Sequence, residues 1–330
     1  MSVTVRCGKR VLLETLAFLI LSGFWVSARV TPSLPEVFPG DDSVVLLGND
    51  PWFHLHQIEG AIEHFPRLIR WDVGSHYPKG IRCAPAGLFH LGAAAVSLGL
   101  GGPASAMALA PLVLAWSPVA LGALSLAFLY LLAREIGGRE LALLTLLLRI
   151  LFPGEELERT LLGFGDYHAA EILLATAGLW TLAHWFNRLS ANVPDSAVPF
   201  RCGRLWGTAG LAAFPFALFQ FVWFGAPLHI AVILLASWFT IAVCLVRSSG
   251  TPGQIVGTLP VFLWLLALTG LIGWLVPDWI MSPSGHRHAL LTLAAQCGLL
   301  LMAGAFLPTL SRRIGKGWSL RMFAFVAFLS

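Results

Sequence analysis

Apolar segments close to 20 residues long recur along this 330-residue chain. A helix of about 20 apolar residues can cross the hydrocarbon core of a bilayer, so the pattern predicts an all-α, multi-span helical membrane protein. The composition agrees, because 57% of the residues are hydrophobic and only 12% are charged, about half the charged fraction of soluble domains. We expect one transmembrane domain over residues 1–330, with about eight full spans and a truncated ninth. The full spans are predicted at 11–28, 106–133, 140–152, 169–187, 205–222, 226–246, 254–276 and 289–309, and the ninth starts near 318.

Basic residues are concentrated in alternate connections between these spans. Those connections contain Arg6, Lys9, Arg10, Arg134, Arg139, Arg188, Arg201, Arg204, Arg247, Arg312, Arg313 and Lys316. The other connections, such as PEVFPGDDS and FPGEELERT, are acidic or mixed. The positive-inside rule then predicts a cytoplasmic N-terminus, provided that segment 84–102 lies on the membrane or dips into it without crossing. This topology gives external loops at 29–105 and 153–168, in the cell membrane if the protein is prokaryotic.

The remaining composition excludes several classes of protein. The net charge of +4 predicts no nucleic-acid partner, because the basic residues lie between spans and form no patch. Five cysteines without CxxC spacing indicate neither a disulfide framework nor a zinc site. The N-terminal segment has features of a signal peptide, but Glu14 interrupts its apolar core, so we expect a retained first span.

Each external loop has a carboxylate at the expected start of a helix. Asp50 followed by Pro51 is typical of an N-cap followed by proline, and Asp166 precedes a long apolar helix. Capping alone is the simpler interpretation of each residue. However, a helix N-terminus stabilises an ionised carboxylate, and a metal ligand must be deprotonated, so one residue can do both. With His168 two positions after Asp166, the loops offer Asp, Asp and His ligands that suit Mn²⁺ or Mg²⁺ when water or substrate oxygens fill the open positions.

Other polar residues of these loops have a simpler interpretation. We expect His54 and His56 to lie on the polar face of the first-loop helix or to support the ligands. Glu155, Glu156 and Glu158 are expected to form a solvated loop.

The sequence GNDPWFHLHQIEGAIEHFPRL, followed by WDVGSHYPKGIRCAPAGLF, resembles the first external loop of the oligosaccharyltransferase catalytic subunits, the enzymes of N-linked protein glycosylation. In that family a G-x-D motif precedes an aromatic-rich helix and a passage of the type YP-G…PP-LF. The next stretch is similar to the family's second acidic motif, R-T-x-x-G-x-x-D-x-[HD]-x-x-E. Here its positions are filled by Arg159, Thr160, Gly163, Asp166, His168 and Glu171. The resemblance covers about residues 40–185.

The resemblance implies a role for each matching residue. Asp50 would be the metal ligand of the first motif and part of the catalytic site, and Asp166 and His168 would be the ligands of the second. Arg159, also catalytic, would lie near the lipid-linked phosphates or the acidic cluster, and Glu171 would help to bind substrate. The fold would be of the GT-C type, with membrane-parallel helices in the long first external loop. The reaction would transfer a glycan from a polyprenyl-pyrophosphate lipid to asparagine of an acceptor polypeptide, with Mn²⁺ or Mg²⁺ as cofactor.

The chain also departs from the family pattern. The family has a catalytic Glu on a later external loop and a W-W-D motif in a C-terminal acceptor-binding domain, whereas no Glu follows Glu171 here and no W-W pair occurs. His90, in GLFH, stands where the family often has Asp. We therefore expect an N-terminal fragment that is inactive alone; a split subunit and a shortened relative are the alternatives.

Two further functions remain open. A metal-independent GT-C transferase that uses polyprenyl-phosphate sugars would be separated from the first hypothesis by its independence of Mn²⁺. The second is a transporter or a non-catalytic membrane subunit. A transporter would need ionisable residues buried within its spans, and Glu14 and Arg149 are nearly the only ones.

Overall fold

A computed structural model describes residues 2–40, 43–74, 77–82, 87–152, 154–192, 203–223, 225–226, 228–230, 232, 252–275, 291 and 294. Contacts between Cα atoms divide the chain into two compact units, Met1–Trp180 with Phe221–Trp223, and Thr181–Gln220 with Phe224–Ser330. The predicted single domain stays a prediction. Of the predicted spans, 289–309 and the one from 318 lie almost entirely outside the described residues, and so does most of 226–246.

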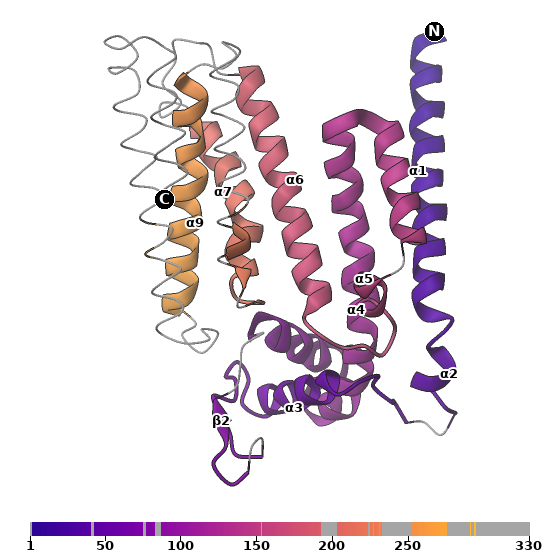
Figure 1. Ribbon diagram of the computed structural model, residues 1–330, viewed down its shortest axis with the longest axis vertical. Coiled ribbons are helices and arrows are strands. Elements are labelled where there is room, and N and C mark those ends of the chain that lie inside the picture. The colour runs from indigo at the N-terminus through magenta and orange to yellow at the C-terminus, as the bar shows by residue number, and fades with distance from the viewer. Residues whose placement is uncertain are drawn as a thin grey trace. The chain divides into compact units, whose positions relative to one another are not determined.

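The first unit is built from long helices and a short helical layer (Figure 1). Its elements are α1 (Ser2–Val30), α2 (Leu34–Val37), α3 (Asp50–Glu63), β1 (Trp71–Asp72), β2 (Ile81–Arg82), α4 (Gly87–Leu151), α5 (Glu155–Glu158) and the start of α6 (His168–Asn192). The helix Arg10–Val30 within α1 and the helix Gly87–Leu151 are long and apolar enough to cross a membrane, and they are the two such helices among the described residues.

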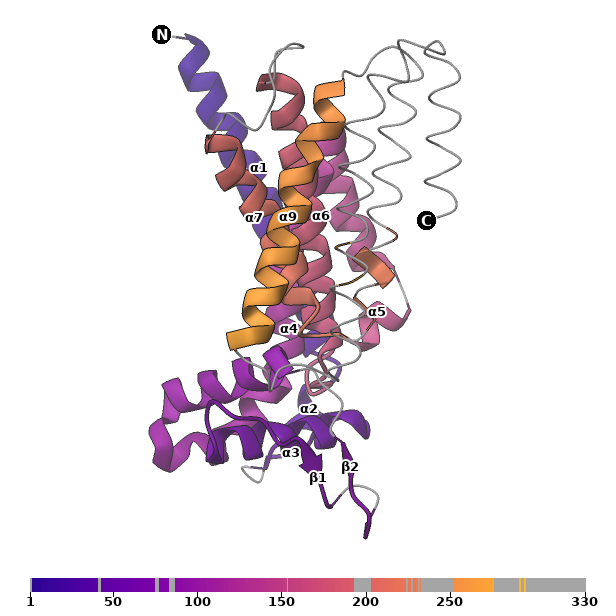
Figure 2. The ribbon, with the colours of Figure 1, turned by 90° about the vertical axis from the view of Figure 1, so that its left-hand side faces the viewer.

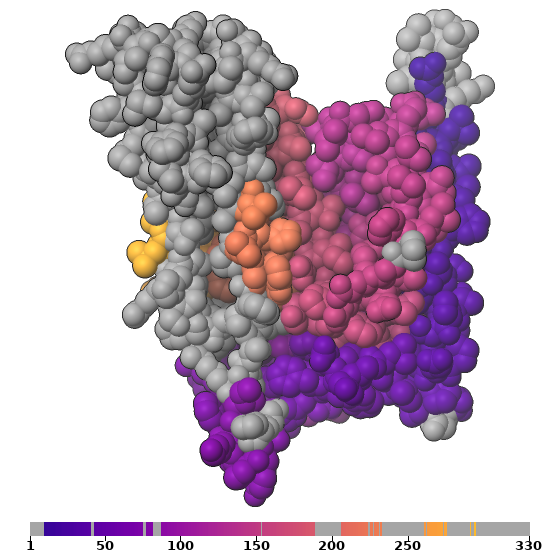
Figure 3. All heavy atoms as spheres, in the orientation of Figure 1, coloured from indigo at the N-terminus to yellow at the C-terminus, as the bar shows by residue number. Residues whose placement is uncertain are grey.

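Helix α4 contains breaks that divide it into three segments. Gly102 has φ 61°, and Gly137 and Gly138 also leave helical geometry, with φ −139° and 78°. The first segment therefore corresponds to the Gly- and Ala-rich stretch that was expected not to cross, and the later two to the predicted spans 106–133 and 140–152. In Figure 2 the first segment and α3 run across the direction of the unit's longer helices. Figure 3 shows the indigo and violet surface of α3 and its neighbouring loops against one end of those helices.

Helices α1 and α4 pack closely because Gly122 leaves room for the ring of Trp25. A Cβ atom at Gly122 would collide with that ring, and Trp25 is fully buried. Glu14 accepts a hydrogen bond from the Tyr130 hydroxyl and lies 3.2 Å from Nη1 of Arg134. The acid that interrupts the first span therefore has its partners on α4.

A two-stranded hairpin follows α3. Strands β1 and β2 are antiparallel, with Trp71 opposite Arg82 and Asp72 opposite Ile81. His56 on α3 lies with Nε2 3.4 Å from Oδ2 of Asp72, so it connects α3 to the hairpin on the polar side of the helix, as expected from the sequence.

The second unit includes the end of α6, α7 (Gly203–Phe219) and α9 (Pro252–Leu275). Thr181 on α6 donates from Oγ1 to the carbonyl oxygen of Ala212 on α7 at 3.3 Å. Gln220, next to the end of α7, donates from Nε2 to Oγ1 of Thr269 on α9 at 2.7 Å. Shorter apolar helices in this unit cover Trp206–Phe219 and Leu263–Ile272.

Candidate active site

The candidate site is centred on the carboxylate of Asp166, which lies two residues before α6 and is only 1% exposed. Its Oδ1 accepts the backbone N–H of Tyr167 at 2.6 Å and lies 3.0 Å from Nε2 of His54. Its Oδ2 lies 3.2 Å from Nη1 of Arg159 and 3.5 Å from Nε2 of His168. Both oxygens of one buried carboxylate are thus surrounded by nitrogen atoms.

Backbone hydrogen bonds fix the loop that contains Asp166. Leu162 donates to the carbonyl oxygen of Arg29 at 3.1 Å, and Gly163 donates to that of Ala115 at 2.9 Å. Gly163 has φ 87°, and a Cβ there would collide with Val37, so the turn requires glycine. The carbonyl oxygen of Gly163 in turn accepts the N–H of Leu47 at 2.9 Å. The loop before α6 is thereby hydrogen-bonded to α1, to α4 and to the loop before α3.

Asp50 begins α3 but does not cap it. The N-cap is Asn49, whose side chain makes no capping hydrogen bond, and Pro51 follows Asp50 in the first turn. The sequence-based assignment of Asp50 as N-cap is therefore wrong by one residue. Asp50 is exposed, and its charge is among those acting on Tyr167. Burial, and then the charges of Asp166, Glu171 and Asp50, raise the pKa of that phenol against an opposing effect of Arg159.

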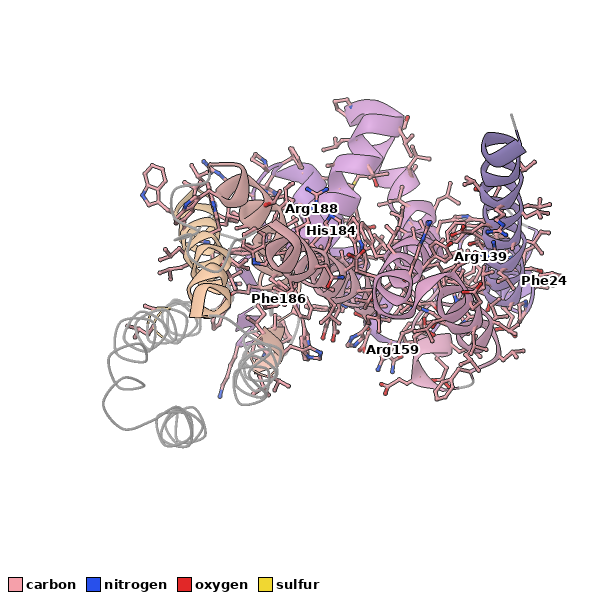
Figure 4. All side chains as sticks on the ribbon, turned by 90° about the horizontal axis from the view of Figure 1, so that it is seen from above. Phe24, Arg139, Arg159, His184, Phe186 and Arg188 are labelled. Atoms are coloured by element: carbon pink, nitrogen blue, oxygen red, sulfur yellow. The ribbon has the colours of Figure 1, made fainter. Side chains whose placement is uncertain are left out.

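Arg159 and His168 of the second motif both contact Asp166, and Glu171 contacts His168. His168 lies with Nδ1 2.9 Å from Oε2 of Glu171, one turn along α6. Arg159 lies with Nη2 3.2 Å from Oε1 of Glu155 and stacks on Phe164, with 5.2 Å from Cζ to the ring centroid. The Arg159 side chain is 25% exposed, and Figure 4 shows it at the edge of the surrounding helices. One side of the site is therefore accessible through Arg159.

Two buried histidines, His54 and His90, extend the site inward, and little in the sequence indicates their role. His54 is 5% exposed and His90, on the first segment of α4, is 2% exposed. Nδ1 of His54 lies 2.8 Å from Nε2 of His90. The sequence expectation that His54 supports a ligand is consistent with its contact to Asp166. The one sequence signal at His90 is that the resembling family often has Asp at this position.

The charges around Asp166 favour its ionised form. Burial alone raises the pKa of the carboxyl group, but the hydrogen bond and charge of His54, the charge of His168 and the N–H of Tyr167 together lower it below the usual value. For His168, the hydrogen bond to Glu171 raises the pKa, burial opposes this, and the charge of Asp166 adds to the increase. Burial, and then the charge of His54, hold the pKa of His90 well below its ordinary value.

The residues fit a divalent cation in part. Adjacent ligand atoms of an octahedral ion with bonds of about 2.1 Å lie about 3 Å apart, close to the 3.5 Å between Oδ2 of Asp166 and Nε2 of His168. Within the described part of the chain, no three His, Cys, Asp or Glu side chains are close enough together to hold a metal ion. A pair of this kind suits an ion that takes its other ligands from water and substrate phosphates, as Mg²⁺ commonly does.

A second polar cluster connects α5, in the same loop as Asp166, to α1 and α4. Glu156 on α5 lies with Oε1 2.9 Å from Nη2 of Arg149 and with Oε2 3.7 Å from Nη2 of Arg29. Arg149 also donates to Oγ of Ser125 at 2.9 Å, and Arg29 stacks on the Trp25 ring, 4.4 Å from its centroid. The expectation that Glu156 belongs to a solvated loop is therefore wrong: its neighbours Glu155 and Glu158 are exposed, but Glu156 joins α5 to α1 and α4.

Known proteins are similar to this chain in sequence. The family described as "Oligosaccharyl transferase STT3, N-terminal" matches residues 16–291. The dolichyl-phosphooligosaccharide-protein glycotransferase 3 of Archaeoglobus fulgidus is 32% identical over 206 residues, which are 60% of this chain and 22% of the relative. The dolichyl-monophosphooligosaccharide-protein glycotransferase AglB of Haloferax volcanii is 30% identical over 162 residues, which are 48% of this chain and 15% of the relative.

Solved structures share the fold. The oligosaccharyltransferase AglB from Archaeoglobus fulgidus, in complex with an inhibitory peptide and a dolichol-phosphate, matches with a TM-score of 0.78 at 23% identity, over 96% of this chain and 36% of that chain. A crystal structure of an oligosaccharyltransferase from the same organism, in complex with Zn and sulfate, matches with a TM-score of 0.76 at 22% identity, over 95% and 38%.

The described part of the chain folds as a helical membrane protein. The chain belongs to the oligosaccharyl transferase STT3 family and corresponds to its N-terminal part. The family recognised from the sequence is thus confirmed. The chain spans 15% and 22% of the lengths of the two curated relatives, and 36% and 38% of the two solved structures.

Proposed function

We propose that this chain is the membrane part of an oligosaccharyltransferase, which transfers a glycan from a polyprenyl-pyrophosphate lipid to asparagine of an acceptor polypeptide. The observation that carries the proposal is the buried Asp166 carboxylate between His54, Arg159 and His168, in a chain of the STT3 family. The names of the relatives support a lipid-linked oligosaccharide as donor and protein as acceptor. A related structure with a tethered acceptor peptide that contains an NVT sequon supports the choice of asparagine.

Three residues are proposed to hold a divalent cation, Mn²⁺ or Mg²⁺. Asp166 and His168 present neighbouring donor atoms, and Asp50 is the proposed third ligand because it is exposed at the start of α3 and acts electrostatically on Tyr167. When bound there, the ion would supply charge neutralisation to a departing pyrophosphate. The low pKa of Asp166 supports this role, since a metal ligand must be deprotonated.

Arg159 and Glu171 are proposed to serve the substrate. The partly exposed guanidinium group of Arg159 can bind a lipid phosphate by charge-assisted hydrogen bonds. Its contact with Asp166 would keep it beside the proposed cation ligands. Glu171 orients the imidazole ring of His168 through their 2.9 Å contact. It would thereby keep Nε2 of His168 directed at Asp166.

The proposed topology follows the distribution of basic residues. The N-terminus would be cytoplasmic, the chain would cross the membrane several times in a GT-C arrangement, and α3 would lie parallel to the external surface. The direction of α3 and of the first segment of α4, across the longer helices, supports this arrangement (Figure 2).

Binding of a short-chain polyprenyl-pyrophosphate sugar to the purified chain tests the proposal. We expect Mn²⁺ to increase the affinity and Arg159→Gln to weaken it with Mn²⁺ present. Arg67→Gln is the matched control, because Arg67 is an exposed arginine in the first external loop. Equal affinity of wild type and Arg159→Gln would contradict the substrate role of Arg159, and no binding by the wild type would contradict the proposal as a whole.

A metal-independent GT-C transferase that uses polyprenyl-phosphate sugars is the second candidate. The ion pair between Arg159 and Asp166 favours it, because the guanidinium group neutralises the buried carboxylate without a metal ion. Donor binding that is unchanged by Mn²⁺ and by a chelator would support this second candidate.

A further inference from the structure

His90, His54 and Asp166 form a continuous buried chain of side chains. They come from the first segment of α4, from α3 and from the loop before α6. The contacts are 2.8 Å from His90 Nε2 to His54 Nδ1 and 3.0 Å from His54 Nε2 to Asp166 Oδ1. All three residues are at most 5% exposed, so water does not compete freely for these hydrogen bonds.

The positions of the hydrogens on His54 follow from its partner. A carboxylate that is paired with a guanidinium group only accepts hydrogen bonds, and Oδ2 of Asp166 lies 3.2 Å from Nη1 of Arg159. Nε2 of His54 must therefore carry a hydrogen. The contact between Nδ1 of His54 and Nε2 of His90 then needs one hydrogen between the two nitrogens. A neutral His90 can provide this contact either as the donor or as the acceptor.

The two oxygens of Asp166 consequently differ. Oδ1 receives two hydrogen bonds from groups that cannot easily move, namely Tyr167 N–H and the buried His54. Oδ2 faces Arg159 and His168, whose side chains are 25% and 27% exposed. These two groups can rearrange when a ligand arrives, so Oδ2 is the oxygen available for a new partner.

We infer that His90 and His54 are positioning residues that hold Oδ1 of Asp166, so that Oδ2 is the oxygen presented to a divalent cation. His90 acts through His54: it fixes the imidazole ring in the orientation that directs Nε2–H at the carboxylate. The inference deepens the proposed function and rests on it for the identity of the ligand. Groups that orient a metal ligand in this way typically change metal affinity about 10–100-fold when they are removed.

Substitutions at His90 separate hydrogen bonding from packing. The amide of Gln has its nitrogen or oxygen close to the position of Nε2 in His and can either donate or accept, so His90→Gln keeps the contact with His54. His90→Leu keeps an apolar side chain of similar size and loses the contact. His64→Gln is the matched control, because His64 follows the end of α3 and its side chain is 67% exposed.

The first measurement is Mn²⁺ affinity of the purified chain. We expect His90→Leu to raise the dissociation constant about 10-fold or more, and His90→Gln and His64→Gln to stay near wild type. An unchanged dissociation constant in His90→Leu would overturn the inference. If His90→Leu does not fold, His90→Asn, whose amide is one carbon shorter, takes its place with the same expectation.

The second measurement is ¹⁵N NMR of the histidine rings in the metal-free wild type, assigned with His54→Gln and His90→Gln. We expect His54 to carry a hydrogen on Nε2, and a bare Nε2 on His54 would overturn the inference independently of any metal. If the wild type binds no Mn²⁺, the metal role in the proposed function fails, and the ring signals of His54 still decide whether it holds Asp166.

Discussion

The backbone N–H of Leu47 donates to the carbonyl oxygen of Gly163 at 2.9 Å, across 116 positions of sequence. Asp50 follows Leu47 by three residues, and Asp166 follows Gly163 by three residues. One backbone hydrogen bond thus sets the relative positions of the two loops that contain the proposed cation ligands.

Removal of either carboxylate should weaken cation binding. We expect Asp166→Ala and Asp50→Ala each to raise the Mn²⁺ dissociation constant by more than the 10–100-fold typical of supporting residues, and His168→Ala to raise it less. Isothermal titration calorimetry of the purified chain measures this. If Asp50→Ala leaves the affinity unchanged, Asp50 acts only on the helix dipole, and its loss should cost about 0.3–1 kcal/mol of stability.

Asp166 and His168 should make the free energy of unfolding depend on pH in opposite directions. The pKa of Asp166 is lowered in the folded state. Its contribution to the free energy of unfolding is therefore fully present above its pKa in the unfolded chain, about 3.9, and is lost as the pH falls through its pKa in the folded protein. The pKa of His168 is raised in the folded state. Its contribution to the free energy of unfolding is therefore fully present below its pKa in the unfolded chain, about 6.5, and is lost as the pH rises through its pKa in the folded protein.

Thermal unfolding as a function of pH separates these two contributions. Asp166→Asn should reduce the loss of stability on the acid side, and His168→Gln should reduce the loss on the alkaline side. An alkaline decline of the same size in His168→Gln would show that another group is responsible for it.

Glu156 should contribute more to stability than its exposed neighbours. Glu156→Gln leaves Arg149 and the fully buried Arg29 without their shared counter-charge, and loss of a hydrogen bond to a charged group costs about 1.5–3 kcal/mol. We expect a loss of about 2 kcal/mol, at the middle of that range because the Glu156 side chain is 29% exposed. The control Glu158→Gln should have little effect, since Glu158 is exposed, and equal losses in the two variants would contradict the role of the cluster.

The topology can be tested with the chain's own cysteines. Cys83 and Cys202 lie outside the described residues, but the positive-inside rule assigns them to opposite sides of the membrane. A membrane-impermeant thiol reagent applied to intact cells should label Cys83 and not Cys202. Labelling of Cys202 under these conditions would reject the assignment of an external site.

The 330-residue chain should not glycosylate a sequon peptide by itself. Attack by the nitrogen of the acceptor amide needs a carboxylate that binds the hydrogens of that amide. After Glu171 the only acidic residues are Asp195 and Asp278, both outside the described residues. The assay is transfer of a lipid-linked glycan to a fluorescent N-x-T peptide with Mn²⁺ present. Turnover that disappears in Asp278→Asn would instead identify Asp278 as the group that replaces the loop Glu.

The sequence predicts which motif residues lie close together better than it predicts the residues that support them. The proximity of His168 and Glu171, three residues apart on α6, follows from the 3.6-residue periodicity of a helix, and His168 also lies close to Asp166, two residues before it. Glycine content also indicated where the first segment of α4 ends, because Gly102 has φ 61°; that this segment does not cross the membrane stays a prediction. The contacts of His90 with His54, and of Glu156 with Arg29, could not be predicted in the same way, because they join residues whose distance depends on how three separate elements pack.

The polar cluster of Glu156, Arg149 and Arg29 limits which segments can be exchanged between related proteins. The guanidinium group of Arg29 and its carbonyl oxygen contact residues of the second loop, and Arg149 connects that loop to Ser125. In a chimera that receives only residues 153–167 from a relative, Arg29 and Arg149 of the host would contact a foreign segment that does not supply their present partners. The smallest transferable cassette therefore also includes the end of α1 and the part of α4 from Ser125 to Arg149, and grafts shorter than this should yield misassembled protein.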